Sequence, residues 1–475
     1  MIESLFRKFY LQTIGLRKGI VPSILERSSS GRAVFLICKT VKKMVFTFFM
    51  KRKGEKEMKK LLAVLLAMMM VFSLVGCSSN KEEAPAETPA EETASDAKIG
   101  IILVGDENEG YTYAHMEGIK AAAKSLGISD DTILWKYVVP ETQACYDAAV
   151  DLVENGATLV ISNSYGHQSF MQQAATEFPE VTFVADTGDT AAVSGLANFK
   201  NAFTKVYESR YVSGIVAGMK IKELEANGAL VPENFDADGN VKVGYVGAFP
   251  YAEVVSGYTA FFLGLRSVYP NAVMFVEYTN SWFDITAEAT VGDDLMSQGC
   301  VIVGQHADST GAPSQLQKNM EDNKYGFTAY SVGYNVSMLD VAPDVALTSA
   351  SNVWEKFYTY AFNCWLNGED MMTDWTGGYN EGAVAITDLG ASVAEGTKEA
   401  VDAAIAAIKD GSLHVFDAST FTVGGATPTS MMADVESDPN YTADTECLID
   451  GYFHESEFRS APYFAERIDG ITELN

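Results

Sequence analysis

The feature that most constrains the fold is a repeated alternation of short apolar runs and helical stretches from Lys98 onward. The first unit ends at Gly127 and joins an aliphatic run, a polar loop and a stretch in which Met116, Ile119 and Ala123 recur at helical spacing. Alternation of this kind predicts an α/β fold with parallel sheets. The candidate strands are Lys98–Gly105, Thr132–Val139, Thr158–Asn163, Val181–Asp186, Val241–Phe249, Ala272–Thr279, Cys300–Gln305 and Gly326–Gly333.

The second half of this region repeats motifs of the first half in the same order and at nearly one offset. The three pairs are Lys98-Ile-Gly with Lys242-Val-Gly, Lys136-Tyr137 with Glu277-Tyr278, and Asp151-Leu-Val-Glu-Asn-Gly156 with Asp294-Leu-Met-Ser-Gln-Gly299. Such a repeat predicts two similar lobes, and a chain of 475 residues can bury more than one core. Because parallel sheets bind ligands at their carboxyl ends, we expect a cleft between the lobes that closes on a ligand.

The lobe boundaries follow from this repeat. We expect residues 97–203 to form lobe 1, completed by a returning segment at about 346–385, and residues 204–345 to form lobe 2. Residues 386–475 contain aromatic residues without a clear periodicity, and they are expected to pack on the lobes as a C-terminal segment. The sequence does not indicate which lobe they cover.

A secretion signal is predicted ahead of this body, at Met58–Cys77, where two lysines precede a short apolar run. Its final Leu-Val-Gly-Cys resembles the bacterial lipobox, which implies that Cys77 is lipidated; the alternative is a buried helix with a stray cysteine. Residues 78–96 are acidic, rich in Pro and Ala, and predict a disordered tether. Residues 1–57 are interpreted as a non-native extension, with translation starting at Met58.

The charge distribution bears on the class of partner. The net charge is −29, but residues 1–77 carry 15 Lys and Arg against 4 Asp and Glu, so the remainder is more acidic still. A body of this charge is repelled by nucleic acids and by anionic membrane surfaces. We therefore expect no nucleic acid partner, and contact with the membrane through the lipid anchor only.

Aromatic and amide side chains recur where the candidate strands end. Aromatic rings at both edges of a cleft suit a flat ligand, and amides with an isolated carboxylate would orient its polar groups. For any one aromatic residue, capping of the core is the alternative. The strand-end residues are Tyr111, Tyr113, Asn163, Ser164, Tyr165, Phe249, Tyr251, Asn280, Ser281, Trp282, Phe283, Gln305, His306, Asp308 and Asn335.

Several of these motifs together resemble one bacterial family. They are Gly110-Tyr-Thr-Tyr-Ala-His115, Tyr207-Glu-Ser-Arg-Tyr-Val-Ser-Gly-Ile-Val-Ala-Gly218, Gly244-Tyr-Val-Gly-Ala-Phe-Pro250, Asn280-Ser-Trp-Phe-Asp284 and Gln305-His-Ala-Asp-Ser309. The chain is similar to the basic membrane protein family of solute-binding lipoproteins, the PnrA-like group. The resemblance implies a two-lobed type I periplasmic-binding-protein fold, each lobe a parallel sheet flanked by helices. It also implies a purine-like ligand, nucleoside or nucleobase, delivered to an ABC permease.

The resemblance also implies the site residues. Tyr111 stands where the family usually has Trp, and with Trp282 it is expected to contact the ring, while Asp308 anchors a polar group. The further candidate ligand contacts are Thr112, Tyr165, Phe249 and His306.

The sequence lacks the usual signatures of catalysis. Its five histidines are scattered without metal-ligand spacing, and neither a Gly-x-Ser-x-Gly elbow nor a P-loop occurs. We therefore expect no metal, no cofactor and no enzyme. The predicted signal and the resemblance to solute-binding lipoproteins imply the extracytoplasmic face of the cell membrane, and we expect a monomer there. The alternatives are a sensory lipoprotein that uses the same clamp to signal, and an exported nucleoside-processing enzyme.

Overall fold

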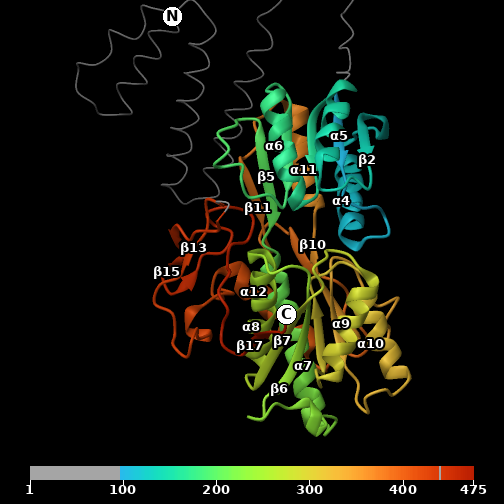
Figure 1. The fold of residues 1–475 in the computed structure, drawn as a ribbon, viewed down its shortest axis with the longest axis vertical. Helices are drawn as coiled ribbons and strands as arrows, with labels where there is room; N and C mark the ends of the chain where they lie inside the picture. Colours follow the sequence, from blue (N-terminus) through green and yellow to red (C-terminus); the bar gives the residue numbers. More distant parts are fainter. Residues whose placement is uncertain (1–96, 438–439) are drawn as a thin grey trace, which may run out of the picture. The chain divides into compact units, whose positions relative to one another are not determined.

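The computed structural model describes residues 97–437 and 440–475, which form one compact body with two large sheets and two small two-stranded ones (Figure 1). The predictions for residues 1–57, 58–77 and 78–96, including the lipidation of Cys77, lie outside the described residues. Among the described residues, none of the helices has the length and apolar character needed to cross a membrane.

The first sheet has six strands in the order β11-β5-β4-β3-β1-β2, and every pairing is parallel. The strands are β1 (Lys98–Ile102), β2 (Ile133–Lys136), β3 (Ala157–Ser162), β4 (Thr182–Asp186), β5 (Phe199–Thr204) and β11 (Asp374–Gly377). The helices around it are α4 (Gly110–Leu126), α5 (Gln143–Glu154), α6 (Gln168–Glu177) and α11 (Glu355–Asn367), with the short 3-10 turns η1 (Asp130–Thr132) and η2 (Tyr165–His167).

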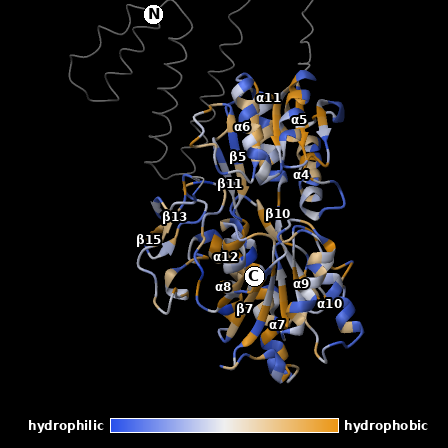
Figure 2. Cartoon of the chain, viewed as in Figure 1, coloured by the Kyte–Doolittle hydropathy of each residue, from blue (hydrophilic) through white to orange (hydrophobic). Residues whose placement is uncertain are grey.

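The first sheet is buried on both faces, because neighbouring residues of a strand point to opposite sides. Ile101 packs with Phe357 of α11 in one apolar cluster, whereas Ile102 packs with Leu152 of α5 in another. Figure 2 shows the apolar residues gathered along the strands and on the helices that pack against them. The uniformly apolar strand at the start of the first lobe therefore follows from burial between two helical layers.

The second sheet has seven strands in the order β12-β10-β9-β8-β6-β7-β17, and only the pairing of β12 with β10 is antiparallel. The strands are β6 (Val241–Gly247), β7 (Ala272–Tyr278), β8 (Ile302–Gln305), β9 (Tyr330–Tyr334), β10 (Ala346–Asn352), β12 (Val384–Ile386) and β17 (Ile471–Glu473). The helices are α7 (Val206–Ala226), α8 (Ala252–Val268), α9 (Ile285–Ser297), α10 (Gly311–Glu321) and α12 (Thr397–Asp410).

The short elements are η3 (Pro232–Asn234), η4 (Ala418–Thr420), and two small hairpins, β13 (Met432–Ala433) with β14 (Thr445–Glu446) and β15 (Leu448–Ile449) with β16 (Tyr452–Phe453). The two-sheet α/β architecture predicted from the alternating pattern is confirmed.

The motif repeat has a packing reason in both sheets. A Cβ atom added to Gly100 of β1 would lie 2.9 Å from Leu152 Cδ1, and one added to Gly244 of β6 would lie 3.0 Å from Leu295 Cδ1. In each lobe, then, glycine in the first strand of the repeat lets the equivalent leucine of the later motif pack on the sheet. The motif repeat therefore reflects one packing arrangement that both lobes use.

The segment that returns to the first sheet is shorter than the predicted 346–385. β10 pairs in parallel with β9 of the second sheet, and β12 pairs with β10, so only α11 and β11 belong with the first sheet. The sequence of β10, Ala-Leu-Thr-Ser-Ala-Ser-Asn, consists of small and polar residues and gives no apolar strand signal. The chain therefore crosses between the sheets after β5, after β10 and after β11.

The C-terminal segment packs mainly on the second sheet. Phe416 and Phe464 belong to the apolar cluster that contains α7 and α8, and β17 pairs with β7 at the edge of the sheet. One contact reaches the first lobe, because the guanidinium of Arg459 lies 3.8 Å from the carboxylate of Asp189 after β4. The segment therefore contacts both lobes.

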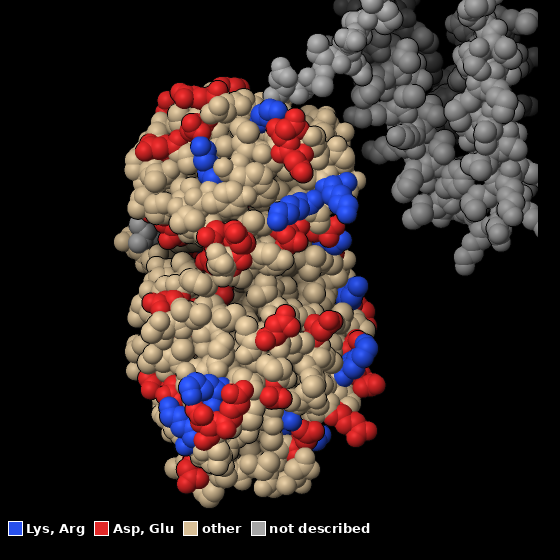
Figure 3. All heavy atoms as spheres, turned by 90° about the vertical axis from the view of Figure 1, so that its right-hand side faces the viewer, with Lys and Arg blue, Asp and Glu red and all other residues tan. Residues whose placement is uncertain are grey.

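Acidic residues occur on both lobes of the face that Figure 3 draws. Figure 3 shows Asp and Glu side chains on both lobes, interspersed with Lys and Arg.

Candidate functional site

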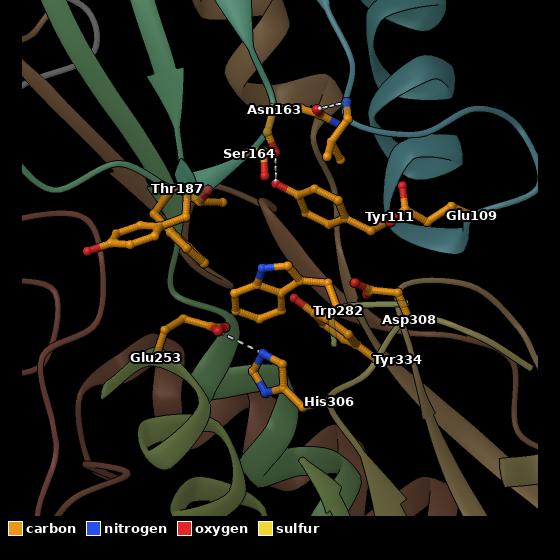
Figure 4. A pocket seen from close by; sticks show the side chains of 13 residues that line it. Glu109, Tyr111, Asn163, Ser164, Thr187, Glu253, Trp282, His306, Asp308 and Tyr334 are labelled. Atoms are coloured by element: carbon orange, nitrogen blue, oxygen red, sulfur yellow. Dashed lines mark hydrogen bonds and ion pairs between the residues drawn. The ribbon is translucent and has the colours of Figure 1, made fainter. Parts of the chain in front are cut away.

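A cavity lies at the carboxyl ends of the strands, with both lobes contributing to its wall (Figure 4). Its volume is about 70 Å³, and a buried water needs roughly 10–15 Å³ on this scale, so the cavity holds a compact group rather than a large ligand. Lobe 1 contributes Val104, Glu109, Tyr111, Asn163, Ser164, Tyr165, Thr187 and Phe203, and lobe 2 contributes Glu253, Trp282, His306, Asp308 and Tyr334.

Tyr111 stands in the first turn of α4 and forms one aromatic wall. Its hydroxyl donates a hydrogen bond of 2.5 Å to the backbone oxygen of Asn163, after β3. Behind it, the ring of His115 makes an edge contact with centroids 4.5 Å apart, and Trp354 makes a second edge contact at 6.5 Å. Trp354 is buried behind Tyr111 and does not line the cavity. The ring is therefore held in a fixed orientation by its own lobe.

A buried polar cluster supports this wall. His115 Nδ1 lies 2.6 Å from the Tyr358 hydroxyl, which donates to Asp186 Oδ2 at 2.9 Å. Burial raises the pKa of Asp186 well above its ordinary value and lowers the pKa of His115 well below its ordinary value. The cluster is thus held by hydrogen bonds in an environment that disfavours both charged forms. It joins the end of β4 to the N-terminal parts of α4 and α11, behind Tyr111.

Trp282, in the loop after β7, forms the aromatic wall on the other lobe. Figure 4 shows its indole facing the space that Tyr111 borders from the opposite lobe. Phe249 packs against it edge to face with centroids 5.0 Å apart. The backbone oxygen of Trp282 accepts a 2.8 Å hydrogen bond from the backbone nitrogen of Asp308, which ties the loops after β7 and β8 together.

Two carboxyl groups from different lobes border the cavity, Glu109 and Asp308. Burial and then the neighbouring Glu109 raise the pKa of Asp308 well above its ordinary value, and burial also raises the pKa of Glu109. The lobes approach closely here, since a Cβ atom added to Gly110 would lie 3.2 Å from the backbone oxygen of Asp308. These acids can accept hydrogen bonds from a ligand, and their raised pKa values make proton exchange part of such binding.

A third acid, Glu253, reaches the cavity from the start of α8. Its Oε2 lies 2.7 Å from Nε2 of His306, and its Oε1 is buried without a hydrogen-bond partner among the described residues. Burial, and then the charge of Arg210, lower the pKa of His306. An unpaired buried carboxylate oxygen is costly, so a hydrogen-bond donor on a ligand would stabilise it.

A line of amide hydrogen bonds leads from Asp308 to the crossovers between the sheets. Asn335 Nδ2 donates to Asp308 Oδ1 at 2.8 Å, and Asn352 Nδ2 donates to Asn335 Oδ1 at 3.0 Å. Thr204 donates to Asn352 Oδ1 at 2.5 Å. Because Thr204 ends β5 and Asn352 ends β10, the line joins the cavity to two of the three crossovers.

Five of the predicted site residues line the cavity and two do not. Those in its wall are Tyr111, Tyr165, Trp282, His306 and Asp308. Thr112 is buried beneath the wall, where its hydroxyl donates to Glu109 and accepts a 3.4 Å hydrogen bond from Asn163 Nδ2. Phe249 supports Trp282 from behind. Both therefore act on residues of the wall instead of facing the cavity.

Several residues of the cavity wall are absent from the predicted set. Thr187 directly follows a candidate strand and Tyr334 follows another, so the strand-end rule, applied throughout, would have found both. Glu253 reaches the cavity from the first turn of a helix and Phe203 from within β5, and no motif marks either. Among the described residues, no group of three His, Cys, Asp or Glu could hold a metal ion.

Residues 97–412 match the family model described as ABC transporter substrate-binding protein PnrA-like. The chain is 29% identical over 320 residues to a purine-binding protein of Brucella abortus (strain 2308), covering 67% of this chain and 83% of that protein. It is 25% identical over 330 residues to a Haloferax volcanii protein with the provisional name ABC transporter glucose-binding protein TsgA13, covering 70% and 76%.

A solved ABC transporter solute-binding protein from Aeropyrum pernix K1 shares the fold, with a TM-score of 0.53 and 15% identity over 70% of this chain and 94% of that one. This likeness confirms the two-lobed solute-binding fold, and the family match confirms the resemblance seen in the motifs. The match ends at residue 412, before most of the C-terminal segment. The chain belongs to the family of PnrA-like ABC transporter substrate-binding proteins.

Proposed function

We propose that this solute-binding protein takes up a purine-like ligand, a nucleoside or nucleobase, and hands it to an ABC permease for import. The observation that carries the proposal is the placement of Tyr111 and Trp282 on opposite lobes, in the wall of one cavity. Two aromatic faces favour a flat heterocycle, each contributing about 0.5–1.5 kcal/mol beyond the apolar area it buries. The name of the Brucella relative supports the same ligand class.

The polar groups of the cavity suit the edge of a purine. Asp308 and Glu109 offer acceptors for ring N–H or amino groups, and the backbone oxygen of Asn163 already positions Tyr111. A site that hydrogen-bonds the edge of its ligand discriminates strongly against analogues that lack those donors. We therefore propose Tyr111 and Trp282 as ring contacts and Asp308 as the polar anchor, with Tyr165 and His306 as further contacts.

Closure of the lobes is the proposed mechanism. A ligand that contacts both Tyr111 and Trp282 binds the closed form better than the open form, so it shifts the population toward closure. The permease would then recognise the closed, ligand-bound form. The free energy of ligand binding would in this way favour the form that the permease recognises. No step of this mechanism requires catalysis by the protein.

Attachment to the outside of the cell membrane through Cys77 is part of the same proposal. It rests on the signal at Met58–Cys77 and on the acidic segment 78–96, which is long enough to separate the folded body from the membrane. Labelling of the expressed protein with a radioactive fatty acid tests it. Cys77→Ser should abolish the label, whereas Cys145→Ser, which replaces a free buried cysteine of the folded body, should leave it unchanged.

The ligand class is tested by thermal shift of the full chain with nucleosides, nucleobases, sugars and amino acids. A ligand at a hundredfold excess over its dissociation constant should add about 2.7 kcal/mol to the free energy of unfolding. We expect purines to raise the melting temperature and glucose to leave it unchanged. A shift with glucose alone would contradict the proposal, as would release of free base from inosine during the incubation.

A further inference from the structure

A second and larger cavity adjoins the first. Its volume is about 460 Å³, against about 70 Å³ for the cavity between Tyr111 and Trp282. The two share five wall residues, so they are neighbouring compartments that meet at a common boundary. The shared residues are Tyr165, Thr187, Phe203, Glu253 and Trp282.

Most of the remaining wall comes from the C-terminal segment, beyond the residues that match the family model. Met432, Ala443, Arg459 and Glu466 all line the second cavity, whereas the family match ends at residue 412. This part of the wall therefore comes from residues that the family model does not cover.

Packing on both lobes fixes this wall. Glu455 is buried and accepts hydrogen bonds from the backbone nitrogens of Tyr463 at 2.6 Å and Phe464 at 2.8 Å. The hydroxyl of Tyr207 in α7 donates to the backbone oxygen of Glu455 at 3.0 Å. On the opposite side, Arg459 forms its 3.8 Å ion pair with Asp189 of lobe 1. Contacts with both lobes thus hold the wall of the second compartment in place.

The charges around the compartment select against anions. The guanidinium of Arg459 is already occupied by Asp189 and by hydrogen bonds of 3.2 Å to the backbone oxygens of Val435 and Ala461. Glu253 and Glu466 add further carboxylates to the wall. A phosphate would meet like charges here, which is unfavourable at close range.

Hydroxyl groups suit the same wall. Oε1 of Glu253 is buried at the boundary between the two compartments and has no partner among the described residues. A hydroxyl that entered the second compartment could donate to this oxygen and remove the penalty of burying it unpaired.

We propose that the C-terminal segment forms a second compartment of the binding site, which takes an uncharged, hydroxyl-bearing substituent carried by the ring in the first compartment. This inference rests on the proposed function. It assigns a role in ligand selection to the described residues of the C-terminal segment that line this compartment. It also implies that a ring with a neutral polyol substituent binds better than the bare ring or its phosphorylated form.

Calorimetric titration of the full chain in detergent with hypoxanthine, inosine and inosine monophosphate tests this. The unaltered protein should bind inosine at least about tenfold more tightly than either of the other two, a difference of about 1.4 kcal/mol. Ala443→Trp places a large side chain in the compartment from an exposed loop position. It should weaken inosine binding at least about tenfold and change hypoxanthine binding less than about twofold. Ala391→Trp, at an exposed loop position outside the cavity, is the matched control.

A charge reversal gives an independent readout in the opposite direction. Glu466→Lys replaces an exposed carboxylate of the wall by an ammonium group, so it should tighten the binding of inosine monophosphate about tenfold. Glu395→Lys, at an exposed position away from the cavity, should have no such effect.

The outcomes separate the two proposals. Binding of hypoxanthine with inosine no tighter, or inosine binding unchanged by Ala443→Trp, would overturn the second compartment and leave the proposed function standing. Tight binding of inosine monophosphate by the unaltered protein, or no gain with Glu466→Lys, would overturn the argument from charge. Failure of hypoxanthine and inosine alike to bind would overturn the proposed function itself.

Discussion

Asn335 donates a 2.8 Å hydrogen bond to Asp308, so the carboxyl group at the candidate site is connected to the residue that follows β9. Asn335 also accepts from Asn352, and Asn352 accepts from Thr204, at the ends of β10 and β5 where the chain crosses between the sheets. A carboxyl group in the cavity wall and the residues at two crossovers thus belong to one hydrogen-bonded line. These side chains therefore connect the wall of the candidate site to the segments that join the lobes.

Removal of the central amide of this line should weaken ligand binding from a distance. Asn352→Ala leaves the partners of Asn352 unpaired in a buried site, so the free energy of unfolding should fall by about 1–3 kcal/mol. The affinity for hypoxanthine should fall as well, although Asn352 does not line the cavity. Chemical denaturation and calorimetry measure the two quantities. Asn363→Ala on α11, whose side chain bonds only the backbone of its own helix among the contacts described, is the control.

Loss of the aromatic wall on lobe 2 should be costly for binding. Trp282→Ala removes a face of the cavity, and we expect the affinity for hypoxanthine to fall about 10- to 100-fold. Tyr111→Phe keeps the ring and removes only its hydrogen bond to Asn163, so its effect should be much smaller. Titration calorimetry measures both. Trp365→Ala, which removes an indole outside the cavity, should leave affinity unchanged, and an equal loss there would argue against a stacking role for Trp282.

Ligand binding should release protons. Burial and the nearby Glu109 hold the pKa of Asp308 well above its ordinary value, so the acid binds a proton over a wider pH range than an exposed Asp. A ligand N–H donates best to the ionised carboxylate, and affinity should therefore rise as pH rises through this raised pKa. Calorimetry in two buffers of different ionisation enthalpy measures the released proton. Asp308→Asn should reduce the release, and any proton still released should come from Glu109, whose pKa is also raised. Uptake of a proton on binding would show instead that the neutral acid is the donor.

The stability of the unliganded protein should fall as pH rises from about 5 to 8. Burial raises the pKa of Glu455 from 4.5 to about 8 and that of Glu288 from 4.5 to about 7. The folded state therefore binds more protons than the unfolded state between these values, and its stability is largest below the unfolded pKa and decreases as pH rises through the folded pKa. Urea unfolding at several pH values measures the slope.

Glu455→Gln provides the internal test of that slope. The variant keeps an acceptor for only one of the two backbone nitrogens of Tyr463 and Phe464, so its overall stability should be lower. Because it cannot ionise, the slope between pH 5 and 8 should become flatter. Glu436→Gln, at an exposed position, should leave the slope as it was. A slope that Glu455→Gln does not change would mean that other groups account for the pH dependence.

Much of the fold could be predicted from the sequence because the buried parallel strands are continuous apolar runs. β1 and β6 are clear from composition alone, and the repeated Gly and Leu that pack on each other in both lobes revealed the duplication. β10 could not be found in this way, since its small and polar residues are buried by contacts with both neighbouring strands and leave no local signal. β17 pairs with β7 about two hundred positions earlier, a relationship that local pattern cannot show.

Part of the candidate site could likewise be predicted from the sequence, and part could not. Tyr111, Trp282 and Asp308 follow strands and carry family motifs, so their side chains could be placed at one edge of the sheets before the structure was known. Thr112 and Phe249 carry the same motifs but lie behind the wall, because a motif fixes the loop and not the direction of each side chain. The C-terminal wall had no motif at all, and only the packing of the folded chain brings it to the cavity.

The most direct test is a crystal structure of the protein grown with hypoxanthine. We expect the ring to lie between the side chains of Tyr111 and Trp282, with a polar edge within hydrogen-bond distance of Asp308 and the two lobes closed around it. Hypoxanthine bound elsewhere on the protein would contradict the account. So would a cavity that stays empty at a saturating concentration of hypoxanthine but binds a sugar.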